Sequence, residues 1–562
     1  MSMHVGGRME TVAPIRVTDG SDRARLIALV LISLLLHAWL IGNSAMTARD
    51  SLGFAQLAMN LAFPKHGKPE LIPGNAASEA IPRTLPQVLK VAKQPPAYPA
   101  TIYATFVIIK RIDPPEDRSK VSPDQLLFAA QIAAATAMIL AVFPMYWLGR
   151  MLLGKSRGFA AVLIFQFLPV AARDTSDGLS EGLYFFCLSS ALALGVAGIR
   201  KQSIGRFLFC GLASGMTYLV RPEGLAVALG GLAVLLGLAA FRLRPTGNMM
   251  ACAAALIAGT CLSAAPYMVM IGGVTNKPSG KNVIDGTPPS GSIRPGLGAI
   301  RMDAPLFAEI NVETDRGGPL EKATAAAGTM AREYLHASHY AVGILGIVGL
   351  FLIRKRLKES PEWFLLLATA AIQLLALARV AYSQGYASER HLLTASFVAV
   401  YFTVGGLEPL FAWFAKWPVV GPLYRKPWIE SVWVAVLIAI CIPSLLKPLH
   451  QNRIGFKKAG EFLATELKPE DKLLDPYEWS QYYAGRTMYW IPNYDYKPVE
   501  YAVLRTGGDS EDKRLNQGVV DHVKKIVADP RAKVVYRWPE GPPEEAKIVI
   551  YRRDHRDPLP GK

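Results

Sequence analysis

The sequence predicts a polytopic α-helical membrane protein with a small α/β domain outside the membrane at its C-terminal end. Of its 562 residues, 51% are hydrophobic and only 19% are charged, whereas soluble chains usually carry about 25% charged residues. The mean hydropathy is +0.24. Along most of the chain, apolar runs alternate regularly with short basic clusters, which is typical of membrane spans and their cytoplasmic loops.

About eleven apolar runs are predicted to cross the membrane. Two of them, 157–172 and 207–219, are shorter than the roughly 17 residues that a span requires, so their ends are the least well defined. No A-x-A-like cleavage site closely follows the first run, which we therefore expect to remain as an anchor. The predicted spans are 24–45, 124–148, 157–172, 181–199, 207–219, 224–241, 249–271, 337–353, 361–379, 391–414 and 431–448.

The basic residues predict the orientation of these spans. Arg23 and Arg25 precede the first span and place the N-terminus in the cytoplasm. The apolar run 97–110 follows Pro95-Pro96 and has about 14 residues, which is short for a span and favours an interfacial or re-entrant helix. Five basic clusters then share the cytoplasmic side, whereas all five would lie outside if this run crossed. These clusters are Arg150-Lys155-Arg157, Arg200-Lys201-Arg206, Arg242-Arg244, Arg354-Lys355-Arg356-Lys358 and Lys416-Arg425-Lys426.

The predicted organisation has three parts: a cytoplasmic tail at 1–23, a membrane domain at 24–448 and an extracytoplasmic α/β domain at 449–562. Within the membrane domain, 46–123 forms a first external loop with interfacial helices. A second long external loop, 272–336, is rich in Gly, Pro, Ser and Lys. A binding loop and a disordered segment are both open interpretations of that loop.

The C-terminal domain shows helical and strand-like patterns in alternation. Helices are predicted at 456–467 and 512–528, and strands at 472–474, 534–536 and 548–551. The domain contains neither a nucleophile elbow nor a phosphate-binding glycine loop. Its aromatic segments are typical of a sugar-binding surface, and packing at the membrane interface explains them equally well. These segments are Asp475-Pro476-Tyr477-Glu478-Trp479 and Tyr482-Tyr483-Ala484-Gly485-Arg486.

Charged residues of four external segments are predicted to lie on one membrane surface. These are Asp50, directly after the first span, and the loops 173–181, 221–224 and 388–391. Ionisable residues at a membrane boundary are functional candidates. Since unrelated surface charges have no reason to share a side, the pattern favours one site over four separate helix caps.

Asp50 by itself has a simpler interpretation. It could cap the N-terminus of a helix whose apolar face is formed by Phe54, Leu57, Ala58 and Leu61. The two roles are compatible, because a cap would hold the carboxylate in place.

Composition argues against several other classes of protein. The net charge of +17 is spread over short clusters and forms no basic patch with interleaved aromatic residues, so no nucleic-acid partner is expected. All five cysteines lie in apolar segments, which predicts neither a disulfide framework nor a CxxC metal site. No HExxH or paired-Cys spacing is present. We therefore predict no cofactor, with a carboxylate-bound divalent ion as the remaining alternative.

The order of the external motifs resembles that of a known superfamily. Over roughly 24–415, the chain is similar to the GT-C superfamily of integral-membrane glycosyltransferases, and in particular to the protein O-mannosyltransferases and the lipid A aminoarabinose transferases. The residues that carry this resemblance are Ala48-Arg49-Asp50, Gln94-Pro95-Pro96-Ala97-Tyr98-Pro99, Arg173 to Glu181, Leu219-Val220-Arg221-Pro222-Glu223-Gly224 and Glu389-Arg390-His391-Leu392-Leu393.

The resemblance implies transfer of a sugar from a polyprenyl-phosphate carrier to a lipid, glycan or protein acceptor on the extracytoplasmic face. A glycosyl phosphate already has a good leaving group, so the protein must supply a base for the acceptor and cations for the phosphate. By resemblance Asp50 is that base, and inversion at the anomeric carbon is expected. Asp174, Asp177 and Glu181 match the acidic second external loop. Asp177 and Glu181 are four residues apart and are expected to share a helix face, although Glu181 could simply be a first-turn carboxylate.

Cationic and aromatic residues of the same motifs are the candidates for substrate contacts. Arg390 is expected to hold the carrier phosphate, with snorkelling or pairing with Glu389 as the alternative. The family commonly has Arg-Tyr where this chain has Arg390-His391, and a lone histidine is more often structural than catalytic. Arg221 could bind phosphate or form an ion pair with Glu223. The remaining candidates are Arg49, Lys93, Tyr98 and Arg173.

Two functions from other classes compete with sugar transfer. A transporter or lipid flippase would need charges along a path through the membrane, and no inverted repeat of short broken helices is present. A non-catalytic scaffold would use the external domain to bind envelope partners. The sequence therefore predicts a glycosyltransferase in the inner (cell) membrane.

Overall fold

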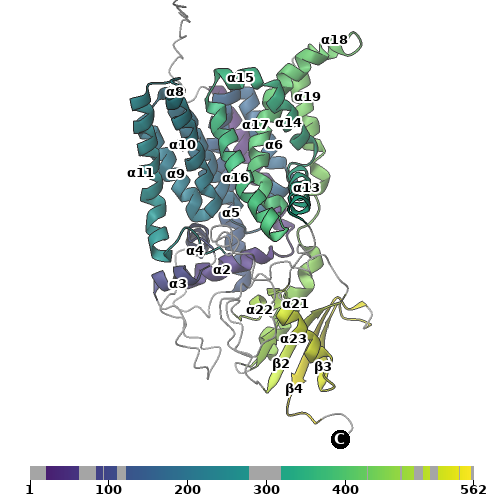
Figure 1. Ribbon diagram of the computed structural model, residues 1–562. Coiled ribbons are helices and arrows are strands. Elements are labelled where there is room, and N and C mark those ends of the chain that lie inside the picture. Colours follow the sequence, from purple (N-terminus) through teal and green to yellow (C-terminus); the bar gives the residue numbers. More distant parts are fainter. Residues whose placement is uncertain are drawn as a thin grey trace, which may run out of the picture.

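The computed structural model shows a bundle of helices with a small sheet domain attached at one end (Figure 1). The structure describes residues 20–62, 84–92, 94–110, 122–277, 318–426, 428–468, 471–486, 498–506, 515, 517–542 and 545–558. The predicted fold class, a polytopic helical membrane protein with a C-terminal α/β domain, is confirmed. Lys93 lies outside the described residues, as do the tail 1–19 and most of the loop 272–336.

Each predicted apolar run is helical, and so is the interfacial segment 97–110. The helices of the bundle and of its external loops are α1 (Gly20–Gly42), α2 (Arg49–Ala62), α3 (Leu85–Val91), α4 (Ala97–Ile109), α5 (Pro123–Leu153), α6 (Lys155–Phe167), α7 (Pro169–Asp174), α8 (Glu181–Lys201), α9 (Ile204–Val220), η3 (Pro222–Gly224), α10 (Leu225–Ala240), α11 (Thr246–Ile271), α13 (Pro319–Ala337), α14 (Ala341–Leu352), α15 (Arg354–Glu359), α16 (Glu362–Gln384), α17 (Glu389–Phe414), α18 (Gly421–Tyr424), α19 (Ile429–Ala439) and α20 (Ile442–Leu445).

The predicted number of eleven spans is not supported. Within the described residues, seven helices are long and apolar enough to cross a membrane, or eight if the bent pair α13 and α14 forms one span. The chain bends by 106° between these two helices. The remaining runs are short for a bilayer about 30 Å thick, because a helix rises only about 1.5 Å per residue. α9, for example, has 17 residues and α6 has 13.

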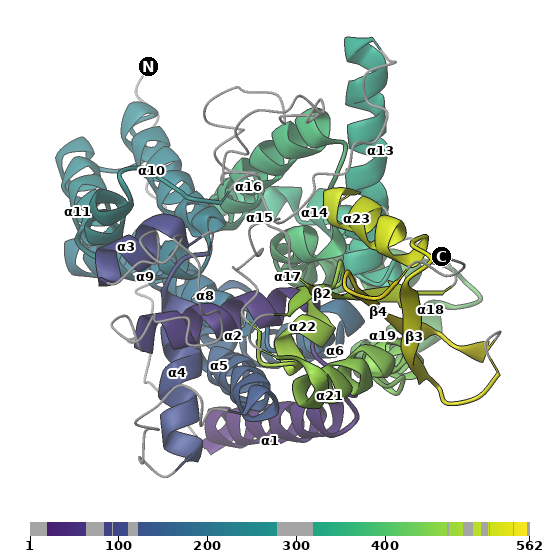
Figure 2. The same cartoon turned by 90° about the horizontal axis from the view of Figure 1, so that it is seen from below.

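The two ends of the bundle carry different loops. Basic residues meet at the upper end in Figure 1, where α15 and α18 lie. There, Arg150 and Lys155 pair with Asp22 at the start of α1, and Arg356 pairs with Glu408. Helices α2, α3 and α4 lie at the opposite end, on the same side as the sheet domain. Seen from below in Figure 2, α2 crosses this end beside α4 and α5, with α22 (Trp479–Tyr483) next to it.

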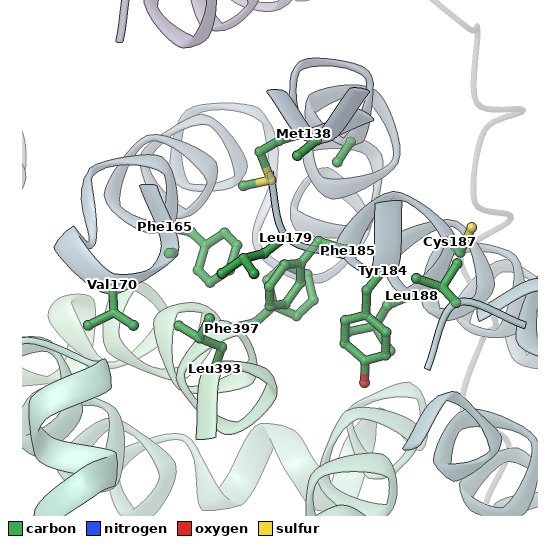
Figure 3. Close-up of a cluster of buried hydrophobic side chains, with 14 of the residues drawn as sticks. Met138, Phe165, Val170, Leu179, Tyr184, Phe185, Cys187, Leu188, Leu393 and Phe397 are labelled. Carbon is green, nitrogen blue, oxygen red and sulfur yellow. The ribbon is translucent and has the colours of Figure 1, made fainter. Parts of the chain in front are cut away.

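A buried aromatic cluster packs between α6, α8 and α17 (Figure 3). The rings of Phe165, Phe185 and Phe397 lie with their centroids 4.9 to 5.7 Å apart. Phe185 lies one turn after Glu181, and Phe397 lies two turns after Arg390. Packing of these rings therefore sets the distance between the charged ends of α8 and α17.

The contact between α5 and α8 requires a glycine at the start of α8. A Cβ atom on Gly182 would lie 2.0 Å from the carbonyl oxygen of Ala134. No side chain fits there, so the two backbones approach closely in the way that small residues permit between membrane helices. Gly182 follows Glu181 directly, and this close contact therefore also fixes the position of that carboxylate.

The C-terminal domain has one four-stranded sheet with a helix on each face. The strands follow the order β1-β2-β4-β3; β1 and β2 are parallel and the other neighbours are antiparallel. The predicted helices and strands all occur, but the central strand β2 and helix α22 were not predicted. The bounds are η5 (Gln451–Arg453), α21 (Ile454–Glu466), β1 (Lys472–Leu474), α22, β2 (Val499–Arg505), α23 (Gln517–Val527), β3 (Ala532–Trp538) and β4 (Ile548–Asp554).

Candidate active site

Asp50 lies at the end of the bundle, in the first turn of α2. It is not the residue before the helix, so its role is not that of an N-cap. The predicted apolar face is present: Phe54, Leu57 and Ala58 are buried, which presses α2 against the bundle. The Asp50 side chain keeps an exposed fraction of 34%, so its carboxylate remains open to a reactant.

Six charged side chains form a chain of alternating sign that begins at Asp50. Arg390 Nη1 donates to Asp50 Oδ2 at 2.6 Å, and Arg390 Nε donates to Glu181 Oε1 at 2.8 Å. The same oxygen of Glu181 accepts from Arg221 Nη1. Beyond this point, Glu223 Oε1 lies 3.6 Å from Arg221 Nη2 and 3.3 Å from Lys277 Nζ. In order, the chain is Asp50, Arg390, Glu181, Arg221, Glu223 and Lys277.

Glu181 is the buried centre of this chain. Its side chain has an exposed fraction of 1% and lies between two guanidinium groups. An ionised carboxylate this deep requires such partners, because removing one charge from water is costly. Glu181 is also the first residue of α8, where the positive helix end favours a carboxylate. The first-turn position of Glu181 is therefore confirmed, and its contact with substrate stays a prediction.

Arg390 pairs with Asp50 and Glu181 rather than with Glu389. Glu389 pairs instead with His336 of α13, and Arg390 at the start of α17 turns toward α2 and α8. Burial acts to raise the pKa of the Asp50 carboxyl, but the charge and the hydrogen bond of Arg390 bring this pKa below its ordinary value. Asp50 is therefore ionised at neutral pH, as a general base must be.

Arg221 occupies a break between two helices. α9 ends at Val220, Arg221 is extended, and the 3-10 turn η3 leads into α10. Arg221 also lies over the ring of Tyr184, 5.5 Å from its centroid. The expected ion pair with Glu223 exists, but the contact with Glu181 is shorter. The break between α9 and α10 thus directs the Arg221 guanidinium group toward Glu181.

Asp177 is engaged in holding the backbone. Its Oδ1 accepts from the Ala48 N–H at 2.9 Å, and its Oδ2 lies 2.7 Å from His450 Nε2. The hydroxyl of Ser51 donates to its carbonyl oxygen at 2.7 Å. The expectation that Asp177 and Glu181 share a helix face is wrong, because α8 begins only at Glu181.

Asp174 stands apart from these pairs. Its buried Oδ2 has no hydrogen-bond partner among the described residues. Burial and the negative charge of Glu181 hold the pKa of the Asp174 carboxyl well above its ordinary value. Asp174 is therefore suited to carry a proton close to Glu181.

The other predicted contacts are distributed around the site. Arg173 Nη2 donates to the Lys447 carbonyl at 3.3 Å. The buried Tyr98 hydroxyl donates to the Ala130 carbonyl at 2.9 Å. His391 Nδ1 lies 3.0 Å from Ser388 Oγ. Within the described part of the chain, these hydrogen bonds lead to groups other than the chain of charges.

Three residues near the site were not found from the sequence as site residues. Lys277 belongs to a Lys-rich external segment, and its position directly after a span was the available signal. His450 contacts Asp177, and Glu478 contacts Arg49. Both lie more than 250 positions from their partners, so no local pattern could indicate them.

One group of side chains within the described residues has the geometry for a metal ion. The ligand atoms of Glu333, His336 and Glu389 lie within 4.8 Å of one another. His336 is more than half exposed, and its ion pair with Glu389 accounts for this grouping without an ion.

Comparisons with known proteins agree with this architecture. Residues 121–272 match the family model of dolichyl-phosphate-mannose-protein mannosyltransferases. No curated protein matches the chain in sequence. Oligosaccharyltransferase AglB from Archaeoglobus fulgidus, solved with an inhibitory peptide and a dolichol-phosphate, superposes with a TM-score of 0.54 at 14% identity, over 83% of this chain and 64% of that one. The present chain thus spans less than two thirds of the length of AglB.

A second solved structure matches in length as well. ArnT from Cupriavidus metallidurans, bound to undecaprenyl phosphate, has a TM-score of 0.52 at 12% identity, over 94% of this chain and 98% of that one. This chain has the GT-C fold. The expected resemblance is therefore confirmed, and it extends beyond the predicted range 24–415 into the C-terminal domain. With this fold and its long apolar helices, the protein is an integral membrane protein.

Proposed function

We propose that this GT-C protein transfers a sugar from a polyprenyl-phosphate donor to a hydroxyl or amine acceptor on a lipid, glycan or protein. One observation carries the proposal: an ionised carboxylate, Asp50, lies at the bundle end in contact with Arg390, the first of three cations in one chain of charges. These are the two groups that transfer from a glycosyl phosphate requires. The partial match to a mannosyltransferase family and the carrier phosphates bound by AglB and ArnT support the same donor class.

In the proposed reaction, Asp50 removes the proton from the acceptor hydroxyl or amine. The acceptor atom then forms a bond to the anomeric carbon as the bond from that carbon to the phosphate oxygen breaks. The carrier phosphate leaves with the electron pair, and the proton stays on Asp50. No protein acid is needed for a phosphate leaving group, in contrast to glycoside hydrolysis. A direct displacement inverts the anomeric carbon.

The chain of charges suggests how donor binding would prepare the base. Arg390 is shared between Asp50 and Glu181, and Arg221 between Glu181 and Glu223. A phosphate that draws Arg390 toward itself weakens its contact with Asp50. The pKa of Asp50 then rises, because the opposite charge that lowered it has moved away. Donor binding would thus increase the basicity of Asp50 when the acceptor arrives.

The other predicted residues take supporting places in this proposal. Asp177, Tyr98 and Arg173 hold the surrounding backbone, and the pKa of Asp174 is raised by burial and by the charge of Glu181. His391 lies directly after Arg390 and bonds to Ser388. Lys277 joins the cations for the donor phosphate. No step requires a metal ion.

Transport and scaffolding are the competing functions. The chain of charges from Asp50 to Lys277 lies at one end of the bundle. A transporter would instead place charged residues along a path near the middle of the membrane. A scaffold would not need an ionised carboxylate that stays partly open beside paired cations. The position and the pairing of Asp50 therefore favour chemistry over both alternatives.

We further place the N-terminus in the cytoplasm and the α/β domain, 449–562, on the extracytoplasmic side of the inner membrane. The basic residues that meet at the α15 end support this orientation through the positive-inside rule. A single cysteine placed at 354–358, in a variant without the native cysteines, should be protected from impermeant thiol reagents in intact cells. Labelling of this cysteine from outside the cell would contradict the proposed orientation.

The function is tested with full-length protein in lipid nanodiscs and a panel of undecaprenyl-phosphate and dolichyl-phosphate sugars. Products are followed by mass spectrometry, with lipid, glycan and peptide acceptors. We expect transfer by the wild-type protein and its loss in Asp50→Asn, with unchanged thermal stability. Glu461→Gln, a change on the exposed face of α21, is the matched control. Transfer by Asp50→Asn at the wild-type rate would remove Asp50 as the base, and inactivity of the wild-type protein on every donor would contradict the function.

A further inference from the structure

The C-terminal domain holds the connection between α1 and α2, which leads directly into Asp50. The Leu449 N–H donates to the Asn43 carbonyl at 3.2 Å, and the Ala45 N–H donates to the Leu449 carbonyl at 3.1 Å. The indole N–H of Trp479 donates to the Thr47 carbonyl at 3.3 Å. This connection is thus bonded to the C-terminal domain at three points before α2 begins.

The strongest of the contacts between these parts involves the residue next to Asp50. Arg49 Nε and Nη2 donate to the two carboxylate oxygens of Glu478, at 2.9 and 2.8 Å. This is the two-point geometry that a guanidinium group forms with a carboxylate, and it fixes orientation as well as distance. Both side chains are largely buried, with exposed fractions of 18% and 8%.

Glu478 is held in an unusual conformation for this contact. Its φ of 70° lies in the left-handed region, which a residue with a side chain adopts only where its surroundings impose it. Asp475 imposes it: its Oδ1 accepts from the Tyr477 N–H at 2.9 Å and its Oδ2 from the Gln481 N–H at 3.0 Å. The hydrogen bonds of Asp475 therefore hold this loop in the conformation that places Glu478 against Arg49.

Trp479 anchors the same loop on its other side. The centroid of its ring lies 5.4 Å from the centroid of the Phe456 ring. The guanidinium carbon of Arg453 lies over the Trp479 ring, 4.8 Å from its centroid. Strained backbone of this kind gathers at functional sites. A loop that served only to join two domains would not need a strained residue aimed at the neighbour of the base.

We propose that Glu478 is a positioning residue for sugar transfer, which fixes the first turn of α2 through Arg49 and so sets the position of Asp50. The inference rests on the proposed function, because it gives Glu478 a role in the step that Asp50 performs. It also assigns the C-terminal domain a part in catalysis without any contact with the reacting atoms.

The physical reason is competition for Asp50. Arg49 and Asp50 are adjacent, and Arg390 reaches Asp50 from the far side. With Glu478 in place, the Arg49 guanidinium group is engaged away from the base. Without Glu478, the Arg49 guanidinium group loses this two-point contact and can reorient toward Asp50, and the first turn of α2 loses this side-chain link to the C-terminal domain. The new pairing would lower the pKa of Asp50, and the lost link would allow the first turn of α2 to move.

The kinetic test uses the donor that the wild-type protein turns over in the panel described above. We expect kcat to fall about 10- to 100-fold in Glu478→Gln, since small displacements of a catalytic group have effects of this size. The KM for the donor should stay within twofold. Arg49→Gln removes the same link without releasing a competing cation, so its kcat should fall in the same direction but less. The double variant should be no worse than Glu478→Gln, because both changes remove one interaction. Glu478→Asp, which keeps the charge, should recover part of kcat, and Glu461→Gln should match the wild type.

Two results would overturn the proposal. An unchanged kcat in Glu478→Gln would show that Glu478 is dispensable. A raised donor KM in Arg49→Gln, together with additive effects in the double variant, would instead mean that Arg49 contacts substrate independently of Glu478.

A second measurement separates this inference from the proposed function. Amide hydrogen exchange of residues 44–60, followed by mass spectrometry, needs no turnover. It should accelerate equally in Glu478→Gln and Arg49→Gln, and stay unchanged in Glu461→Gln. Unchanged exchange in Glu478→Gln would reject the positioning role even if the wild-type protein transfers sugar. A wild-type protein that is inactive on the whole panel would instead contradict the function, and with it the catalytic part of the inference.

Discussion

Arg390 donates a hydrogen bond to Asp50 at 2.6 Å across 340 positions of sequence. Its second hydrogen bond, to Glu181, makes it the link between the base on α2 and the buried carboxylate at the start of α8. A planar guanidinium group can hold two acceptors at a fixed angle, which an ammonium group cannot do. Several expectations depend on this bridge.

Arg390→Lys should lower kcat/KM for the donor about 100-fold, since losing one preorganised donor to developing charge costs roughly this much. Lysine retains the charge but cannot bond to Asp50 and Glu181 at the same angle. The change is measured by steady-state transfer in nanodiscs. Arg379→Lys, at an exposed position on the neighbouring helix α16, should have no effect. Equal activity of the two variants would show that charge alone is sufficient at position 390.

Gly182→Ala should reduce both stability and activity. The new Cβ atom would lie 2.0 Å from a backbone carbonyl of α5, so α8 must move and carry Glu181 with it. We expect a loss of about 1–3 kcal/mol, as for other overpacked contacts, measured as a lowered Tm. Gly205→Ala is the control, because a Cβ there meets nothing within 4 Å. A Tm for Gly182→Ala equal to that of the control would mean that the helices separate freely.

Glu500→Gln should destabilise the C-terminal domain. Glu500 accepts from Lys472 at 3.2 Å and from Arg553 Nε at 2.9 Å, and Lys472 has an exposed fraction of 2%. Removing the carboxylate takes this counter-charge from the buried Lys472, whereas Arg553 keeps Asp529 at 3.2 Å, and breaking a buried pair costs about 3–5 kcal/mol. Lys472→Met should cost less, because Arg553 remains. Hydrogen exchange of β2 and β4 measures both, and a larger effect for Lys472→Met would contradict the assignment of Glu500 as the centre.

The effect of Glu500→Gln should depend on pH. Burial acts to raise the pKa of Glu500, but hydrogen bonds from Arg553 and His555 lower it to about 2, below the ordinary value of 4.5. A depressed pKa adds stability that is complete above the unfolded value and lost as pH falls through the folded one. The difference between the wild type and Glu500→Gln should therefore be constant above about pH 5 and shrink toward pH 2.

Asp475→Asn should show the opposite dependence on pH. Burial raises the pKa of Asp475 from 3.8 to about 6, so the folded state favours the protonated carboxyl. The wild-type protein should lose stability relative to Asp475→Asn as pH rises from about 4 to above 6, by about 3 kcal/mol at most. The Tm difference between the two proteins at pH 4.5 and pH 7.5 measures this effect. A difference that does not change with pH would mean that Asp475 titrates normally.

Local sequence properties predicted much of the membrane domain. Every predicted apolar run is a helix, because hydrophobic length alone determines helices that must satisfy their backbone inside a membrane. The predicted number of eleven spans is not supported within the described residues, since α6 and α9 are apolar yet short. Strand β2 was missed because it is buried on both faces, and its residues show no alternation.

For the candidate site, the sequence predicted several of the residues but not the contacts between them. Asp50, Glu181, Arg221 and Arg390 could be chosen from the sequence, because charge beside an apolar run is visible locally and the basic loops assign a common side. Which of these residues pair with one another could not be predicted from the sequence. Asp177 and Glu181 appeared equivalent, yet one holds the backbone near α2 and the other joins two arginines.

The sequence by itself thus determined a helical membrane protein, the end of the bundle that carries its acidic and arginine residues, and the identity of Asp50 as the leading candidate. Only the tertiary structure decided that Arg390 is shared between Asp50 and Glu181, and that Glu478 of the C-terminal domain holds the neighbour of the base. Hydrophobic and charge patterns report each segment's preference for membrane or water. Contacts across hundreds of residues depend instead on side-chain packing between helices, such as the rings of Phe165, Phe185 and Phe397.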